Sequence, residues 1–355
     1  MRSFRNGLFY SLLLSLTTLS TVPAARAQGN ETCVPAPSGI VSWWPADGNP
    51  NDIVDGNPGA LIGSVTYVPG HVGQAFDFGA VDGAHVRVEN AANLNFNTKD
   101  SYTIEFWMKS EAIPPVGHLT LVGKWQFQAK DSYPYAVRLN TGDIRFPHAV
   151  GTVFCGVFDG TMPFPFIDST VRVDNGQFHH IACVYNHVSQ TVTIYIDGSP
   201  DGTTSSVGLV NPLSNRTHVS FGIRGNGNPI SEFNGVLDEV TLYDRALSHV
   251  DIADIFLAGS AGKCKGLQLI PPLFDQVQDL IDASVLTPGQ GGDLINKLER
   301  VREKLDRGNT RPAINQVGAF INQVNNFFDA GVLTIEQRDT LVDLANGVID
   351  LINSL

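Results

Sequence analysis

The sequence has few charged residues and an excess of acidic over basic ones. Charged residues make up 16% of the 355 residues and hydrophobic residues 43%, which excludes a coiled coil and a disordered acidic tail. Lys and Arg number 23 against 35 Asp and Glu, so the formal net charge is −12. The sequence also lacks a basic run with interleaved aromatics. We therefore expect no nucleic-acid partner, because phosphate backbones repel an acidic protein.

The N-terminus carries the pattern of a secretory signal. Arg2 and Arg5 precede an apolar stretch at 8–19, and the small-residue site Ala25-Arg26-Ala27 follows it. The stretch is too short for a membrane anchor, which needs about 20 apolar residues, and no later segment reaches that length. We expect residues 1–27 to be a signal peptide, and the remaining chain to be secreted or held at the cell surface without a membrane span.

Cysteines are scarce, and their spacing is not that of a zinc or redox motif. The chain has four of them, Cys33, Cys155, Cys183 and Cys264, and no two form C-x-x-C. In an oxidising compartment disulfides are the default. Cys33 and Cys264 flank a single block whose termini should lie close together, so we expect this pair to be joined. Pairing of Cys155 with Cys183 stays open, because Cys183 lies in an apolar run that would also suit a buried thiol.

Short β-branched and aromatic runs separated by Gly, Asn, Asp and Pro fill residues 38–258. The run 102–108 alternates between apolar and polar residues, as do 191–196 and 236–243, and such alternation predicts antiparallel strands. No helical periods separate the runs. We therefore expect an all-β sandwich in which two sheets share a core.

The hydrophobic period changes after residue 267. Apolar residues recur at helical spacing in four stretches, which predicts a small all-α four-helix domain over 267–355. The segment Asp282–Gln290 matches Asp329–Gln337 at six of nine positions, so the domain is expected to consist of two related helical hairpins. In each turn a threonine precedes a glutamine by three residues, the spacing of a capping box.

The order of motifs in the β block resembles that of the laminin G-like jelly-roll modules of secreted bacterial proteins, in the concanavalin A-like class. The segments that carry the likeness are 41–45 with 47–52, 68–70 with 73–76, 102–108, 177–182, and 235–240 with 243–248. The resemblance implies a jelly-roll sandwich over 33–264. The tail is similar to the C-terminal helical module called FIMAH, on 294–308 and 313–325, and this likeness implies an accessory role.

Calcium is the cofactor that the sandwich is expected to bind. Asp47 and Asp52 lie in a Gly/Asn/Pro-rich loop and offer hard oxygen ligands, which such loops supplement with carbonyl oxygens. Members of the resembled class often bind calcium, and Asp238 is a candidate third ligand from a late strand. The alternative is that these aspartates cap turns through hydrogen bonds to backbone N–H groups.

Three aromatic residues are candidates for ligand binding. Trp125, Tyr133 and Tyr135 lie among polar residues around Pro134, where ring faces could stack on a sugar or a protein partner. Trp43 and Trp44 are adjacent on an expected strand, so they should face opposite sides and one of them should be partly exposed. The alternative for all these rings is a place in the core.

We expect no enzymatic activity. A glycoside hydrolase needs two carboxylates about 5–9.5 Å apart, yet Glu105 alternates with Trp107, and Asp238 and Glu239 are adjacent and should face opposite sides. The sequence thus predicts an exported non-enzymatic module that binds a glycan or an extracellular protein. The alternatives are an attachment protein whose helical tail docks and, third, a polysaccharide-active enzyme.

Overall fold

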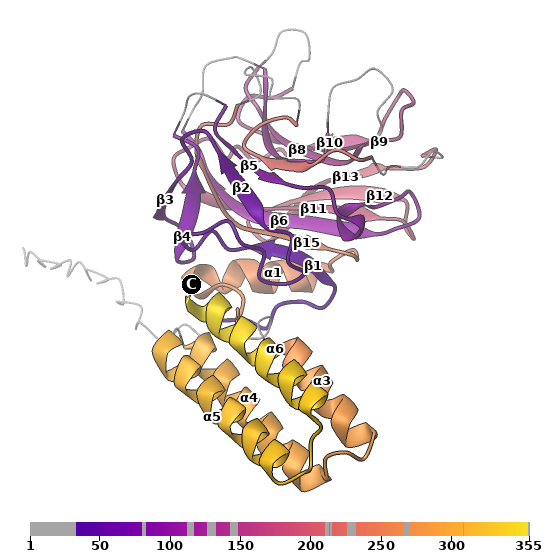
Figure 1. Cartoon of the computed structure of the whole chain (residues 1–355). Helices are drawn as coiled ribbons and strands as arrows, with labels where there is room; N and C mark the ends of the chain where they lie inside the picture. The colour runs from indigo at the N-terminus through magenta and orange to yellow at the C-terminus, as the bar shows by residue number, and fades with distance from the viewer. Residues whose placement is uncertain are drawn as a thin grey trace, which may run out of the picture. The chain divides into compact units, whose positions relative to one another are not determined.

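The computed structural model describes residues 33–79, 83–111, 117–125, 133–142, 148–209, 213, 215–225, 232–265, 270–307 and 309–353 (Figure 1). The expected signal peptide lies outside these residues. Within the described ranges, every helix is too short or too polar to cross a membrane.

The strands of the described residues form two antiparallel sheets. The eight-stranded sheet has the order β13-β12-β11-β6-β15-β4-β3, with β1 also paired to β15, and the seven-stranded sheet has the order β10-β9-β8-β7-β14-β5-β2. The strands are β1 (Ile40–Trp44), β2 (Gly59–Ile62), β3 (Thr66–Pro69), β4 (Gln74–Asp77), β5 (His85–Val88), β6 (Tyr102–Lys109), β7 (His118–Gly123), β8 (Tyr133–Asn140), β9 (Val153–Phe158), β10 (Phe166–Asp168), β11 (Phe178–Asn186), β12 (Thr191–Ile196), β13 (Ser199–Ser205), β14 (Val219–Phe221) and β15 (Val236–Tyr243). A short 3-10 helix, η1 (Ala92–Leu94), precedes β6.

The core between the sheets follows the alternation of the sequence. On β6, Tyr102, Ile104, Phe106 and Met108 belong to the large buried cluster, while Glu105 and Trp107, which alternate with them, lie on the outer face of the sheet. The jelly-roll-like sandwich predicted from the sequence is confirmed.

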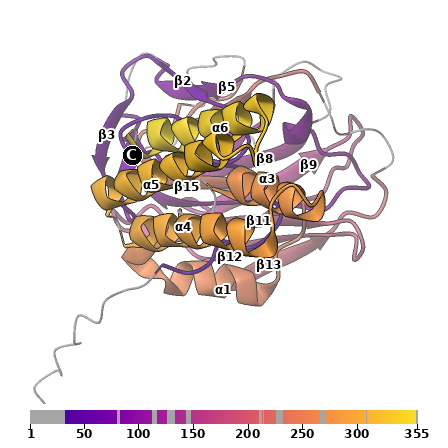
Figure 2. The same ribbon diagram turned by 60° about the horizontal axis from the view of Figure 1, so that its bottom comes forward.

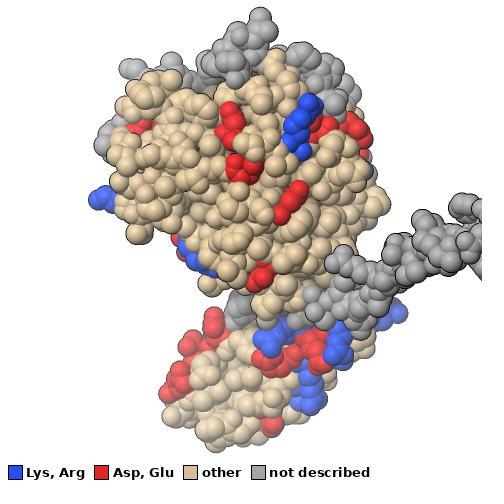
Figure 3. All heavy atoms as spheres, turned by 180° about the vertical axis from the view of Figure 1, so that it is seen from behind, with Lys and Arg blue, Asp and Glu red and all other residues tan. Residues whose placement is uncertain are grey.

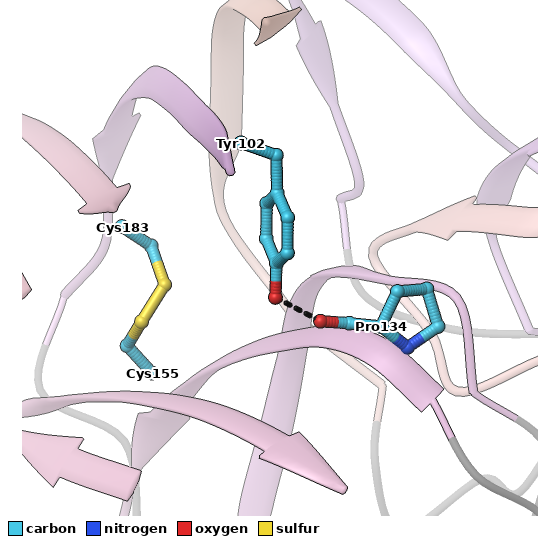
Figure 4. The surroundings of a disulfide bond; sticks show 4 residues. All are labelled: Tyr102, Pro134, Cys155 and Cys183. Carbon is cyan, nitrogen blue, oxygen red and sulfur yellow. Dashed lines mark hydrogen bonds between the residues drawn. A yellow bond between two sulfur atoms is a disulfide. The ribbon is translucent and has the colours of Figure 1, made fainter. Parts of the chain in front are cut away.

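Covalent and polar links join the two sheets. Cys155 of β9 is bonded to Cys183 of β11, and the Tyr102 hydroxyl of β6 donates to the Pro134 carbonyl of β8 (Figure 4). A second disulfide joins Cys33 to Cys264 and so closes the β block at its two ends. Both pairings are confirmed, including the one that the sequence left open.

A helix that the sequence analysis missed follows the last strand. The region to residue 258 was read as strands, but residues His249–Leu257 form α1 and Gly259–Ala261 form the short 3-10 helix η3. Ser248 caps α1 and forms a capping box with Asp251. The spacing of Ser248 and Asp251 is a helix-start signal that can be recognised in the sequence. It was overlooked because α1 is only nine residues long and shows few periods.

The C-terminal part contains four helices, α3 (Pro271–Asp282), α4 (Pro288–Asp306), α5 (Thr310–Asp329) and α6 (Ile335–Asn353). Neighbours in sequence pack side by side, and α3 also contacts α6, so the four close into one bundle (Figure 2). The capping boxes expected in the two related turns are present: Gln290 N–H donates to Thr287 Oγ1 at 3.3 Å, and Gln337 N–H donates to Thr334 Oγ1 at 3.3 Å.

Candidate ligand-binding face and buried charge cluster

The outer face of the seven-stranded sheet carries a group of aromatic and cationic side chains. On β8, Tyr135, Val137 and Leu139 point into the core, so Arg138 lies on the opposite, outer face. On β9 the same alternation places Phe154 outside. Two parts of the sheet that are distant in sequence thus bring a guanidinium group onto aromatic rings.

Trp125, two residues after the end of β7, is the centre of this group. Its side chain is half-buried. The guanidinium carbon of Arg138 lies 4.2 Å from the centre of its ring, and that of Arg224 lies 4.7 Å away. Contacts of this kind are attractive, because the ring face is electron-rich. The two arginines therefore hold the indole in place while part of it stays exposed to solvent.

The other two aromatic residues predicted to bind ligand are buried. Tyr133 is 3% exposed and its ring centre lies 5.5 Å from that of Trp125, whereas Tyr135 is 1% exposed and belongs to the core between the sheets. A buried ring cannot stack on a ligand. Of the three candidates, Trp125 is therefore the one with accessible surface, and its role in binding stays a prediction.

A second polar site lies on the outer face of the eight-stranded sheet. Glu105 is fully buried; its carboxylate accepts from Lys263 Nζ at 2.5 Å and lies 3.0 Å from His180 Nε2. Burial raises the pKa of Glu105, but Lys263 and His180 outweigh it and lower the pKa to about 2. The Glu105 carboxylate is therefore held in a buried ion pair and is not accessible to solvent from this face of the sheet.

Asp238 and Glu239 lie in the same cluster, contrary to the expectation that they face opposite sides. Glu239 has φ of 57°, and the pairing of β15 with β6 shifts register between Asp238 and Thr241. Such a bulge adds a residue and breaks the alternation. As a result Glu239 accepts from Trp43 Nε1 at 2.9 Å and lies 2.9 Å from Lys265 Nζ.

Trp43 and Trp44 are both fully buried, so the expectation that one is partly exposed was wrong.

The structure separates the three predicted calcium ligands into two places. Asp47 pairs with Lys265 and accepts from Gln74 N–H at 2.9 Å, next to the cluster that contains Asp238. Asp52 is 5% exposed and accepts from backbone N–H groups of Trp43, Val54 and Asn57 at 2.9, 3.0 and 3.1 Å. Within the described residues no three His, Cys, Asp or Glu side chains form a metal-binding group.

Calcium binding stays a prediction, and the melting temperature tests it. A cation that binds only the folded state raises stability by about 2.7 kcal/mol at 100 times its dissociation constant, so the melting temperature should rise with calcium and fall with chelator. Asp47→Asn and Asp52→Asn should remove that response. Asp55→Asn is the control, because Asp55 is exposed in the same loop. A melt that ignores both millimolar calcium and chelator would mean that Asp52 only caps its loop.

The buried acids also set a pH dependence. Burial raises the pKa of Asp238 and that of Glu239, and their mutual repulsion adds to the effect on Asp238. The folded chain therefore holds these protons more tightly than the unfolded chain does, and stability should increase as pH falls from neutral toward the ordinary carboxyl range near 4. Urea unfolding at a series of pH values should show this rise, and Asp238→Asn should reduce it. An equal reduction by Asp55→Asn would contradict this assignment.

Two family models match the chain. Residues 79–253 match the model described as the concanavalin A-like lectin/glucanases superfamily, and residues 273–350 match the FIMAH domain. The two matches fall on the sandwich and on the helical bundle. No curated protein matches the sequence.

Several solved structures resemble this chain at low sequence identity. The binding domain of Paraclostridial Mosquitocidal Protein 1 is 18% identical, with a TM-score of 0.50 over 61% of this chain and 52% of that one. The binding domain of botulinum neurotoxin DC, solved with rat synaptotagmin II, is 14% identical, with a TM-score of 0.49 over 62% and 51% of the two chains. Domain 4 of an extracellular arabinanase from Geobacillus stearothermophilus, solved with arabinotriose, is 18% identical, with a TM-score of 0.43 over 61% and 97%.

The first of these structures shows a shared fold, and the match spans about half of its length, 52%. The motifs in the sequence, the two antiparallel sheets and the family models agree on the architecture. The chain is thus similar to the concanavalin A-like lectin/glucanases superfamily over residues 79–253 and to the FIMAH domain over residues 273–350.

Proposed function

We propose that the chain is a non-enzymatic binding module that recognises a glycan or an extracellular protein through the outer face of the seven-stranded sheet. The observation that carries this proposal is the half-buried Trp125, held between the guanidinium groups of Arg138 and Arg224. Tryptophan, tyrosine and arginine are enriched among the residues that dominate binding energy, and the aromatic rings bury large areas at a small cost in entropy.

Action outside the cell or at its surface is part of the same proposal. Disulfides persist in oxidising compartments, and Cys33–Cys264 and Cys155–Cys183 are both formed. The acids on the outer face of the other sheet support a non-enzymatic role. Glu105 and Glu239 are buried and lie against Lys263 and Lys265, so neither carboxylate is free to transfer a proton to a ligand.

Among the described residues of the helical domain, side chains of opposite charge lie close together. Figure 3 shows one face of the molecule, on which side chains of both charges gather over the helices while the sandwich is mostly uncharged. On α4, Arg302 pairs with Glu299, and the C-cap residue Arg307 pairs with Glu303 at 2.7 Å. Exposed pairs of this kind contribute little. We therefore place the binding face on the sandwich, with the helices as an accessory.

A glycan array, with extracellular proteins on the same surface, tests the proposal on the full chain. Trp125→Ala should weaken binding of any hit by roughly 10-fold or more, the usual effect of losing an aromatic anchor. Tyr195→Ala is the control, since Tyr195 is a half-buried aromatic on the other sheet and its loss should change binding less than about twofold. Binding that survives Trp125→Ala would instead favour an attachment protein that docks through its helices.

A further inference from the structure

The helix α5 of the C-terminal bundle has a solvent-facing surface without charged side chains. It lies between α4 and α6 (Figure 2) and turns its other face into the core, where Val317, Phe320 and Val324 are fully buried. Arg311 and Asp329 lie near its two ends, and the sequence between them contains no Lys, Arg, Asp or Glu. The neighbouring helix α4 carries charged residues along most of its length. Since the outer face of a surface helix is ordinarily charged, the neutral face of α5 is unusual.

Three side-chain amides line this neutral face. Asn315, Asn322 and Asn326 are all exposed. With 3.6 residues per turn they fall within an arc of about 40° on the side opposite the core, and with the usual rise the row is roughly 16 Å long. In the described part of the chain none of the three amide groups has a hydrogen-bond partner. Each amide therefore offers both a donor and an acceptor to a ligand that approaches from solvent.

Helix stability does not account for these residues. Asparagine is among the weaker helix formers, because its side chain competes with the helix for backbone hydrogen bonds. Gly318, one turn after Asn315, weakens the helix further. A Cβ at Gly318 would meet no atom within 4 Å, so packing does not require the glycine. Residues that weaken a helix without serving its packing indicate a functional surface.

The related hairpin of the same domain provides an internal comparison. Aligning the two repeated turns places Asp275 and Asp279 of α3 at the positions of Asn322 and Asn326 of α5. Both aspartates are exposed as well. The helical fold thus accepts carboxylates at these positions. The amides of α5 are therefore not a requirement of the bundle, and their neutrality is a property of this one surface.

We propose that the amide row of Asn315, Asn322 and Asn326 binds a neutral, extended polysaccharide of the cellulose or chitin type along α5. An amide donates and accepts at once, so each can bond to neighbouring sugar hydroxyls. A charged polymer would exchange the hydration of its charges for a surface that offers no ion pair. Asn315 and Asn322 are about 10 Å apart along the helix, close to the disaccharide repeat of such a polymer. The proposal adds a second binding surface and does not rest on the face of the sandwich.

Binding isotherms of the full chain on microcrystalline cellulose and on chitin test the proposal. The parent should bind at least one of the two polymers. Asn322→Asp combined with Asn326→Asp should weaken this binding by about 10-fold or more, because a carboxylate has lost the donor and brings a charge. The variant reproduces the pattern of Asp275 and Asp279 in α3, so the bundle should still fold.

A second variant separates binding from folding. Replacing Asn315, Asn322 and Asn326 together by alanine should also weaken binding by about 10-fold or more. The same change should raise the melting temperature of the helices by at least about 4 °C, because alanine is the better helix former. Helical circular dichroism measures this shift. A lower melting temperature would mean that the amides stabilise the bundle, and would overturn the proposal.

Asn296→Ala combined with Asn346→Ala is the matched control. These asparagines are exposed on α4 and α6, outside the row. Their loss should change binding less than about twofold, since side chains outside a contact contribute little to it. An effect equal to that of the α5 variants would mean that exposed amides bind the polymer unspecifically. Equal binding to the acidic polymer polygalacturonate would overturn the neutral ligand class.

The remaining outcomes separate this surface from the function proposed for the sandwich. Trp125→Ala should leave binding to cellulose or chitin within about twofold of the parent. Binding that is lost in Trp125→Ala and kept in the α5 variants would assign the polymer to the sandwich and overturn the present proposal alone. Self-association on size exclusion that depends on the amides, without polymer binding, would assign the row to a second copy of the chain. Binding to neither polymer would also overturn the proposal, and the array on the sandwich would remain unaffected.

Discussion

Replacing Lys263 with methionine is expected to lower the free energy of unfolding by about 3–5 kcal/mol, because it leaves a buried carboxylate without its cation. Lys263 is 3% exposed and Glu105 is fully buried, with Lys263 Nζ 2.5 Å from Glu105 Oε1. The ammonium group also donates to Thr241 Oγ1 at 3.0 Å and lies 4.7 Å from the ring centre of Trp43. Methionine keeps the apolar stem and loses all three contacts of the charge.

Urea unfolding followed by tryptophan fluorescence measures this loss. All four tryptophans, Trp43, Trp44, Trp107 and Trp125, lie in the β block, so the signal reports the sandwich. Arg87→Met is the control: Arg87 pairs with Glu89 at 2.8 Å, but the two side chains are 43% and 77% exposed, and exposed pairs contribute little. A loss in Lys263→Met no larger than in the control would show that solvent reaches Glu105.

The pH dependence of the free energy of unfolding below neutral pH tests the same ion pair in a second way. The pKa of Glu105 falls from its ordinary value of 4.5 to about 2 in the folded chain. A lowered folded pKa contributes stability that is present above 4.5 and is lost as pH falls toward 2. Lys263→Met should weaken this acid-side loss, because the cation that lowers the pKa is gone. The double variant Lys263→Met with Glu105→Gln should recover part of the stability.

Local signals in the sequence predicted most of the architecture. Alternation identified strands such as β6, helical periods identified the four C-terminal helices, and the repeated turn identified both capping boxes. Each of these depends on residues close together in the chain. The bulge at Glu239 was missed because it depends on how β15 pairs with β6, which no local pattern specifies.

The candidate site was less accessible to sequence reasoning for the same reason. Trp125 stood out as an aromatic residue among polar ones, but Arg138 is one arginine in an ordinary alternating strand. Its importance comes from the rings of Trp125 and Phe154. The three residues lie on three segments whose register is fixed only by folding. Burial of Tyr133 and Tyr135 likewise depends on the packing of the two sheets.

Removal of the Cys33–Cys264 disulfide is expected to cost about 5 kcal/mol by the chain-entropy relation, in which longer loops give larger effects. The two cysteines are 231 residues apart, whereas Cys155 and Cys183 are 28 apart. For the shorter loop the same relation gives roughly 3–4 kcal/mol. The variant with Cys33→Ser and Cys264→Ser should therefore lose more stability than the one with Cys155→Ser and Cys183→Ser, if loop closure dominates over the packing of the buried sulfurs.

The Cys33–Cys264 disulfide should also stabilise the ion pair of Lys263 with Glu105. Lys263 directly precedes Cys264, and it pairs with Val34, next to Cys33, in an isolated β-bridge. Without the covalent link, the segment that delivers the ammonium group to Glu105 is held by the hydrogen bonds of this bridge, at 3.0 and 2.8 Å. Removing the disulfide and Lys263 together should then cost less than the sum of the two separate losses, by about 0.5–3 kcal/mol for coupled neighbours. Unfolding followed by tryptophan fluorescence measures this difference in four proteins: the parent, the variant without the disulfide, Lys263→Met, and the variant with both changes. Mass mapping of unreduced protein checks the cysteine pairing. Strict additivity would show that the bridge positions Lys263 without the disulfide.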